Sequence, residues 1–255
     1  MSDDPRETAP QSLGLYASKY AFAPVFSAAF NNFVWLYVRP RISGVENLPE
    51  SGAYILAANH ASHADTPIVF AAVPGRLRRR LVAAAADDYF FDGGLREAVA
   101  RSLFNAIPIE RKPLPGVDPL RHANRALREG YGLLLFPEGT RSRDGSVAPF
   151  RLGIGRLIAE NPGVPVVPVW LDTAGKVLPK GKIVPRPYTV GVRFGAPLFL
   201  QAQPDDRASW RAAADAVRAA LIALSQQPAP PRHPWYGRLP WRRPPAPAPA
   251  DDRAV

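Results

Sequence analysis

The stretch Ala53–Asp65, AYILAANHASHAD, joins a short apolar run to a cluster of polar side chains. Its first six residues, Ala53–Ala58, are uncharged and are followed by Asn59, a pattern typical of a buried strand that ends in a turn. The same pattern recurs along the chain. Four further apolar runs bounded by Gly, Pro or Asn predict strands at Leu81–Ala85, Gly132–Phe136, Val164–Leu171 and Thr189–Phe194.

Helix-like segments separate these predicted strands. They are Thr66–Val73, Leu95–Phe104, Pro119–Glu129 and Leu152–Glu160, followed by an Ala-rich amphipathic segment at Asp205–Leu224. Strands that alternate with helices predict an α/β fold, in which helices cover both faces of a mixed, largely parallel sheet. The two prolines in Val164–Pro168 predict that this strand lies at an edge or follows a bulged path.

Composition limits the class of protein and the kind of partner. The 255 residues, 47% hydrophobic and 21% charged, suit one domain with tails. The chain has no cysteine, which excludes a disulfide scaffold, a thiol nucleophile and a thiolate-ligated metal. A net charge of +10 favours an anionic partner: nucleic acid, an anionic bilayer or a phosphorylated substrate. The acidic start, MSDDP, does not resemble a secretory signal.

Four regions differ in character. Residues 1–11 are polar and predicted to be disordered, whereas residues 12–39 are apolar and aromatic. Residues 40–226 carry the alternating strands and helices, and residues 227–255 form a Pro-rich basic tail that is predicted to be disordered. Trp and Arg side chains interleave in that tail, which suits either headgroup contact or a free protein-binding segment.

The aromatic region predicts an amphipathic helix. Aromatic residues at spacings of three and four would form one stripe, with Ser27 and Asn31 on the other side; they are Phe22, Phe26, Phe30, Phe33 and Tyr37. We expect this helix to lie in a membrane interface or to re-enter it, flanked by basic residues. A true span, interrupted by Pro24 and the Asn pair, and a helix packed on the protein's own core are the alternatives. The basic run Arg76–Arg80 is a second candidate for lipid contact or, equally, the solvated end of a helix.

His60 and Asp65 follow the first predicted strand. On a continuous helix, five positions would place them about 140° apart, so a direct contact requires His60 in the loop and Asp65 in the first helical turn. The pair would then form a general base, in which the carboxylate fixes the tautomer of the imidazole. Two alternatives remain at this point: Asp65 as a simple N-cap before Thr66-Pro67, and a metal site that uses His60 and His63.

The segment Phe136–Ser142, FPEGTRS, ends another predicted strand. Gly139 permits close approach of a ligand to the backbone, Arg141 can bind a phosphate in bidentate fashion, and Glu138 could orient Arg141 or accept a substrate hydroxyl. A plain turn is the alternative, and the segment lacks the Gly-Lys-Ser/Thr element of a nucleotide P-loop. Arg111 follows a short apolar run at Ile107–Ile109 and, by itself, suits a solvated charge at a strand end.

Taken together, the order and spacing of four segments resemble the glycerolipid acyltransferases, the family that includes 1-acyl-glycerol-3-phosphate acyltransferase. The resemblance covers residues 42–197. Its first motif, N-H-x-x-x-x-D, is matched from Asn59 to Asp65, and its third, F-P-E-G-T-R-S, from Phe136 to Ser142. The second, G-x-x-x-I-x-R, is matched at Ile109 and Arg111 but has Asn105 in place of the glycine, and the fourth, V-P-V-x-P, is matched at Val164–Pro168.

The resemblance implies an acyltransferase domain over residues 40–226, a reaction and roles for particular residues. His60, oriented by Asp65, would deprotonate the free hydroxyl of a lysophospholipid such as 1-acyl-glycerol-3-phosphate, and the product would be phosphatidic acid. The acyl donor would be acyl-CoA or acyl-carrier protein, with no metal or bound cofactor. The residues implied to bind substrate are Arg111, Glu138, Gly139, Thr140 and Arg141 on the acceptor side and Val167 and Pro168 on the donor side.

The same resemblance implies a peripheral or monotopic protein on the cytoplasmic face of an anionic membrane. Another lyso-lipid acceptor, such as a lyso-ornithine lipid, would need the same catalytic pair. A non-catalytic protein that binds lipid or acyl-carrier protein is a further alternative, against which the presence of both His60 and Asp65 argues. Nucleic acid is not an expected partner, because no recognition module is found in the sequence.

Overall fold

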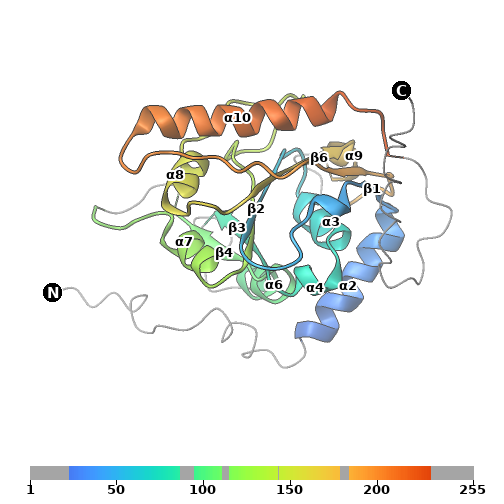
Figure 1. The fold of residues 1–255 in the computed structure, drawn as a ribbon. Helices are drawn as coiled ribbons and strands as arrows, with labels where there is room; N and C mark the ends of the chain where they lie inside the picture. Colours follow the sequence, from blue (N-terminus) through green and yellow to red (C-terminus); the bar gives the residue numbers. More distant parts are fainter. Residues whose placement is uncertain (1–22, 87–94, 111–114, 143, 179–183, 231–255) are drawn as a thin grey trace, which may run out of the picture.

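The computed structural model describes residues 23–86, 95–110, 115–142, 144–178 and 184–230. A seven-stranded sheet in the order β1-β7-β6-β2-β5-β3-β4 forms its centre (Figure 1). All neighbouring strands are parallel except β6 and β7. The bounds are β1 Arg41–Ser43, β2 Tyr54–Ala58, β3 Leu81–Ala86, β4 Ile107–Ile109, β5 Gly132–Leu135, β6 Val166–Asp172 and β7 Gly191–Phe194. The predicted mixed, largely parallel sheet is confirmed.

Helices cover this sheet on both faces, with α10 and α8 on one side and α2 and α3 on the other (Figure 1). Five helices, α3, α6, α7, α8 and α10, coincide with the predicted segments to within about two residues, as is usual for helix ends. The predicted helical region 12–39 contains α2, and its first part, residues 12–22, lies outside the described residues. The short elements α4, α9 and η1 were not predicted. The bounds are α2 Ala23–Val38, η1 Val45–Asn47, α3 Asp65–Ala72, α4 Gly75–Arg78, α6 Leu95–Phe104, α7 Arg121–Arg128, α8 Gly153–Glu160, α9 Ala174–Val177 and α10 Arg207–Ser225.

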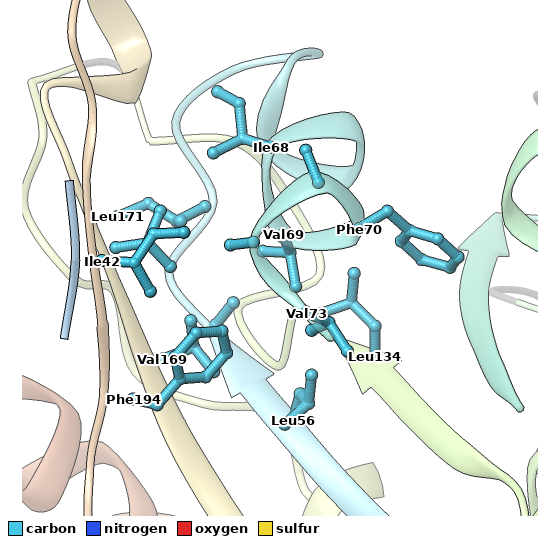
Figure 2. Packing of buried hydrophobic residues seen from close by; sticks show 14 of the residues in the cluster. Ile42, Leu56, Ile68, Val69, Phe70, Val73, Leu134, Val169, Leu171 and Phe194 are labelled. Atoms are coloured by element: carbon cyan, nitrogen blue, oxygen red, sulfur yellow. The ribbon is translucent and has the colours of Figure 1, made fainter. Parts of the chain in front are cut away.

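Two hydrophobic cores form because successive side chains of a strand point to opposite faces of the sheet. In β2, Leu56 contributes to the core beneath α3, whereas Ile55 contributes to the core beneath α7, α8 and α10. Figure 2 shows Val69 of α3, and Val73 directly after this helix, above Leu56 of β2, with Leu134 of β5 beside Val73. Since β2 and β5 are parallel neighbours, the loops that follow them emerge at the same edge of the sheet.

The prediction that the proline-containing strand lies at an edge is wrong. β6 pairs with β2 on one side and with β7 on the other. Val169 pairs with Phe194, and Val166 pairs with Leu198. Between these two pairs, three residues of the 194–198 segment face only two residues of β6. The extra residue belongs to the 194–198 segment and lies opposite Val167, because the N–H of Gly195 donates to the carbonyl of Pro168 in the register of β7. The pairing is therefore bulged beside the prolines, but the inserted residue is in the partner segment, whereas β6 keeps its register with β2.

Helix α2 does not present its aromatic residues as one stripe. Phe30 packs edge-to-face on Phe104 of α6, whereas Phe33 is 59% exposed. Asn31, expected on the polar side, is buried at 1% exposure beside the buried Val34. The predicted division of faces is therefore wrong, because α2 packs against α3 and α6 through a face that contains Asn31. Phe22 and the side chain of Phe26 lie outside the described residues.

None of the helices in the described part of the chain is both long and apolar enough to cross a membrane. The basic run Arg76–Arg80 binds backbone carbonyls. Arg78 donates to the carbonyl of Phe70 in α3, and Arg80 donates to the carbonyl of Glu129, just after α7. These contacts favour the helix-end alternative over lipid contact, since cations stabilise the carbonyl ends of helices.

Candidate active site

His60 and Asp65 are in direct contact at the carboxyl end of β2. The Nδ1 atom of His60 lies 2.8 Å from Oδ2 of Asp65, and the imidazole stacks on Phe136 with ring centroids 4.2 Å apart. The ring is 22% exposed, whereas the carboxylate is fully buried. When the carboxylate accepts a hydrogen bond from Nδ1–H, the lone pair of the neutral imidazole is on Nε2. The geometry therefore matches the predicted placement of His60 in the loop and Asp65 in the first helical turn.

Asp65 does not act as a simple helix cap. It is the first residue of α3, the N-cap position is Ala64, and no side chain caps this helix end. The Oδ2 atom instead turns back to accept hydrogen bonds from the backbone N–H groups of Ala61 at 2.7 Å and Ser62 at 2.8 Å. Three donors thus converge on one carboxylate oxygen, and they fix both the loop and the imidazole. The N-cap alternative is wrong for this residue.

Glu138 joins the two motif loops. Its Oε1 accepts a hydrogen bond from the backbone N–H of His60, and its Oε2 accepts one from that of Ala148, both at 2.9 Å. The side chain is 4% exposed, and burial raises the pKa of its carboxyl. A second link runs from the backbone N–H of Ser142 to the carbonyl of His60 at 2.7 Å. Both carboxylate oxygens of Glu138 therefore accept hydrogen bonds from backbone N–H groups.

Gly139 and Arg141 belong to the loop of the third motif, Phe136–Ser142. Gly139 has φ +70°, and a Cβ there would overlap the side chain of Arg151, so this position requires glycine for both conformation and space. Nη1 of Arg141 is buried and has no hydrogen-bond partner among the described residues. A buried guanidinium N–H without an acceptor suits an anion that binds beside it. Thr140, in contrast, is exposed.

A cavity of about 840 Å³ opens beside these loops. His60, Arg141, Gly139 and Thr140 line it together with apolar side chains. The apolar residues come mainly from β3, α6, β5 and α8, and include Ala83, Ala84, Ala85, Ala100, Phe104, Ala106, Leu135 and Leu157. The predicted catalytic histidine and a predicted phosphate-binding arginine thus share one cavity that also has an extended apolar lining.

Four basic residues that line the cavity were not predicted to bind substrate or to act as the base: His63, Arg151, Arg156 and Arg207. Burial lowers the pKa of His63, and the positive charge of Arg141 lowers it further. Arg156 is held by Glu160 at 2.7 Å and Asp118 at 2.9 Å. Arg151 lies immediately after Phe150 beyond the third motif, and this adjacency was the signal in the sequence that could have identified it.

The donor-side residues predicted from the fourth motif lie elsewhere. Val167 and Pro168 are buried within β6, opposite Leu56 and Ala57 of β2, and neither lines the cavity. Arg111 lies outside the described residues. Asn105 precedes β4 with φ +46°, and its side chain donates to the carbonyl of Leu81 at 3.0 Å. It therefore adopts the left-handed conformation, which glycine adopts without steric cost and which asparagine tolerates better than most residues.

Within the described residues, no group of three or more His, Asp or Glu side chains is placed to hold a metal ion. His60 and His63 both line the cavity, but the acidic partner of His60 is the single carboxylate of Asp65.

Comparison with known proteins identifies the family of the chain. The family model described as Acyltransferase matches residues 39–172, which include both motif loops. The chain belongs to the acyltransferase family. Its acyltransferase region is 31% identical over 156 residues to the chloroplastic 1-acyl-sn-glycerol-3-phosphate acyltransferase BAT2 of Brassica napus, a match over 58% of this chain and 41% of that protein.

A bacterial relative with the name 1-acyl-sn-glycerol-3-phosphate acyltransferase, from Pseudomonas aeruginosa, is 30% identical over 171 residues, which are 65% of this chain and 62% of that one. The acyltransferase fold also resembles the crystal structure of the 1-acyl-sn-glycerophosphate (LPA) acyltransferase PlsC from Thermotoga maritima. That match has a TM-score of 0.58 at 23% identity, and covers 85% of this chain and 96% of that chain. The chain spans about half the length of the first curated relatives that it matches, 41%, 40% and 57%.

Proposed function

We propose that this acyltransferase moves an acyl group from a thioester, acyl-CoA or acyl-carrier protein, to the free hydroxyl of 1-acyl-glycerol-3-phosphate, and that the product is phosphatidic acid. The observation that carries the proposal is the His60–Asp65 contact of 2.8 Å within a cavity that Arg141 also lines. The names of the relatives support the choice of acceptor.

In the proposed reaction, Nε2 of His60 takes the proton of the acceptor hydroxyl as its oxygen attacks the thioester carbonyl carbon. The new O–C bond forms, the C–S bond breaks, and the imidazolium returns the proton to the leaving sulfur, which gives a free thiol. No acyl-enzyme is formed, and no metal or bound cofactor takes part. Asp65 holds the tautomer and stabilises the imidazolium, and general-base catalysis of this kind contributes about 10²- to 10⁴-fold.

The cationic part of the cavity suits the acceptor's phosphate. Arg141 supplies the guanidinium, whose buried Nη1 has no acceptor in the described structure. Gly139 and Thr140 line the cavity beside it, and the side chain of Arg151 packs directly against Gly139. Arg111 is proposed to bind the same phosphate. Glu138 acts on this site through the two loops that its carboxylate joins.

The apolar lining of the cavity suits an acyl chain, because an alkyl chain gains about 0.8 kcal/mol for each CH₂ that it buries. An acceptor of this kind resides in a bilayer. We therefore propose that the protein acts peripherally at the cytoplasmic face of an anionic membrane, towards which its net charge of +10 would attract it.

The decisive experiment is an assay of the purified full chain with labelled acyl-CoA and acyl-carrier protein against a panel of lyso-lipids, including 1-acyl-glycerol-3-phosphate and a lyso-ornithine lipid, with products identified by mass. We expect His60→Ala to lower kcat by at least about 10²-fold. Asp65→Asn should lower kcat as well, because an amide cannot fix the same tautomer.

His122→Ala is the matched control, since His122 does not line the cavity. Its activity should stay close to that of the wild type. Near wild-type transfer by His60→Ala would refute the mechanism, and transfer only to another lyso-lipid would refute the proposed acceptor.

A further inference from the structure

An apolar surface lies where α2 meets the segment that follows α9. Four of its side chains are strongly exposed: Phe33 at 59%, Leu36 at 69%, Val184 at 71% and Tyr188 at 42%. Phe33 stacks on Tyr37 with ring centroids 5.7 Å apart, and the hydroxyl of Tyr37 donates to the carbonyl of Pro185 at 2.8 Å. These contacts join two segments that are far apart in sequence, and we name residues 33, 36, 184 and 188 the outer apolar surface.

We propose that the outer apolar surface inserts into the interface of an anionic lipid bilayer, with residues 184–188 as an insertion element beside α2. The inference deepens the proposed function, since it assigns the surface by which the enzyme would reach a bilayer-borne acceptor. Exposed apolar side chains that cluster in this way mark interaction sites, and the backbone and the charge of this segment identify a bilayer as the partner.

The backbone of residues 184–188, Val-Pro-Arg-Pro-Tyr, suits an apolar environment. Two of the five residues are prolines, which have no N–H group to desolvate. The N–H of Arg186 donates to the carbonyl of Val177 at 2.7 Å, and the N–H of Tyr188 donates to the carbonyl of Arg186 at 2.8 Å. The carbonyl of Pro185 accepts from Tyr37. Internal pairing of this kind removes the cost, several kcal/mol for each unpaired group, of burying a polar backbone in lipid.

The charges around the surface complement anionic headgroups. Residues 28–39 and 184–189 contain no Asp or Glu, and they carry Arg39 and Arg186, both of which are exposed. Each basic side chain near an anionic membrane contributes about fivefold in affinity. Tyr188 has an amphipathic ring of the type that concentrates at the level of the headgroups.

The same segment is connected to the loop that carries the catalytic histidine. Leu178 follows Val177 directly, and its carbonyl accepts a hydrogen bond from Oγ of Ser62 at 3.0 Å. Thr173 donates to the carbonyl of Thr189 at 2.9 Å and thereby fixes the other end of the segment. Insertion would therefore place the His60 loop at a defined distance from the bilayer.

The chain has no cysteine, so a single one can be labelled without background. We would place an environment-sensitive fluorophore on the full-length Val184→Cys variant and, as the matched control, on Phe199→Cys. Phe199 is 70% exposed, but its neighbour Leu198 pairs with Val166 at the start of β6, whereas Thr173 follows the end of β6. β6 therefore separates Val166, which lies beside the Phe199 probe, by about 20 Å from Thr173, which contacts Thr189 in the segment of the Val184 probe.

The probe at position 184 should shift to the blue when vesicles of phosphatidylcholine and phosphatidylglycerol are added, and the probe at 199 should not. The double variant V184S/Y188S should bind these vesicles about tenfold more weakly or worse, while F199S binds as the wild type. Arg186→Gln should weaken binding by about fivefold, and only when phosphatidylglycerol is present.

No acyl donor or acceptor is present in these measurements, so their failure is distinguishable from failure of the proposed reaction. A probe at 184 that does not respond while the protein binds vesicles would overturn the proposal, as would a wild type that does not bind. A blue shift that rises with protein concentration in the absence of lipid, together with a dimer in sedimentation, would assign the surface to a second copy and overturn it as well.

Discussion

The Oε1 atom of Glu138 lies 2.9 Å from the backbone nitrogen of His60, and its other oxygen lies at the same distance from the backbone nitrogen of Ala148. A residue of the third motif therefore fixes the backbone at the histidine of the first motif. The bond from Ser142 N–H to the carbonyl of His60 acts on the same residue. The two motif loops thus behave as one unit, although 78 residues separate Glu138 from His60.

Replacement of Glu138 should reduce the rate more than the binding of the acceptor. In Glu138→Ala, the N–H groups of His60 and Ala148 lose their acceptor, and we expect kcat to fall by about 10- to 100-fold with an acceptor KM within about twofold of the wild type. Glu138→Gln keeps one carbonyl oxygen as an acceptor, so its kcat should lie between that of the wild type and that of Glu138→Ala. Steady-state kinetics with 1-acyl-glycerol-3-phosphate test this. A raised KM with an unchanged kcat would show that Glu138 binds substrate directly.

Replacement of Arg141 should have the opposite effect: it should raise the acceptor KM more than it lowers kcat. Its guanidinium lines the cavity, and Nη1 has no partner among the described residues. Because a charge-assisted hydrogen bond contributes about 1.5 to 3 kcal/mol, Arg141→Ala should raise the acceptor KM by about 10- to 100-fold and leave the donor KM nearly unchanged. Arg79→Ala, at an exposed position after α4, is the control. An unaltered acceptor KM in Arg141→Ala would reject the phosphate assignment.

The sequence predicted features that depend on local pattern. Apolar runs predicted the strands. The first and third motifs predicted that His60 acts together with Asp65, and the structure has the two side chains in contact. Features that depend on tertiary neighbours were missed. The burial of Asn31 reflects packing of α2 on α3 and α6, and the interior position of β6 depends on pairing with a strand that follows it in the chain. Neither contact leaves a periodic signal in the sequence.

Val167 and Pro168 illustrate the same limit in the site itself. The fourth motif is apolar, and an apolar strand can face either a substrate or a core. Pairing with β2 and β7 buries it in the sheet, and so these residues do not line the cavity. The apolar lining of the cavity comes mainly from β3, α6, β5 and α8, and the segments at β3 and α6 contain none of the quoted motifs.

His63 should make stability depend on pH. Burial, then the charges of Arg141 and His60, lower its pKa below the ordinary value of 6.5. The unfolded chain therefore binds more protons than the folded chain as the pH falls through 6.5, so the free energy of unfolding should decrease from about pH 7 to about pH 5. His63→Gln cannot titrate, and its decrease should be smaller. Urea unfolding of both proteins at the two pH values measures the difference; equal decreases would contradict the prediction.

Asn105 offers a test of backbone strain at the end of α6. The residue has φ +46°, a conformation that costs an alanine about 1 to 2 kcal/mol but costs glycine almost nothing. Its side chain also donates to the carbonyl of Leu81 at 3.0 Å, a bond that both Asn105→Ala and Asn105→Gly remove. The strain therefore appears as the difference between the two variants. Asn105→Ala should be about 1 to 2 kcal/mol less stable to urea than Asn105→Gly. An alanine variant as stable as the glycine variant would show that this turn does not require the left-handed conformation.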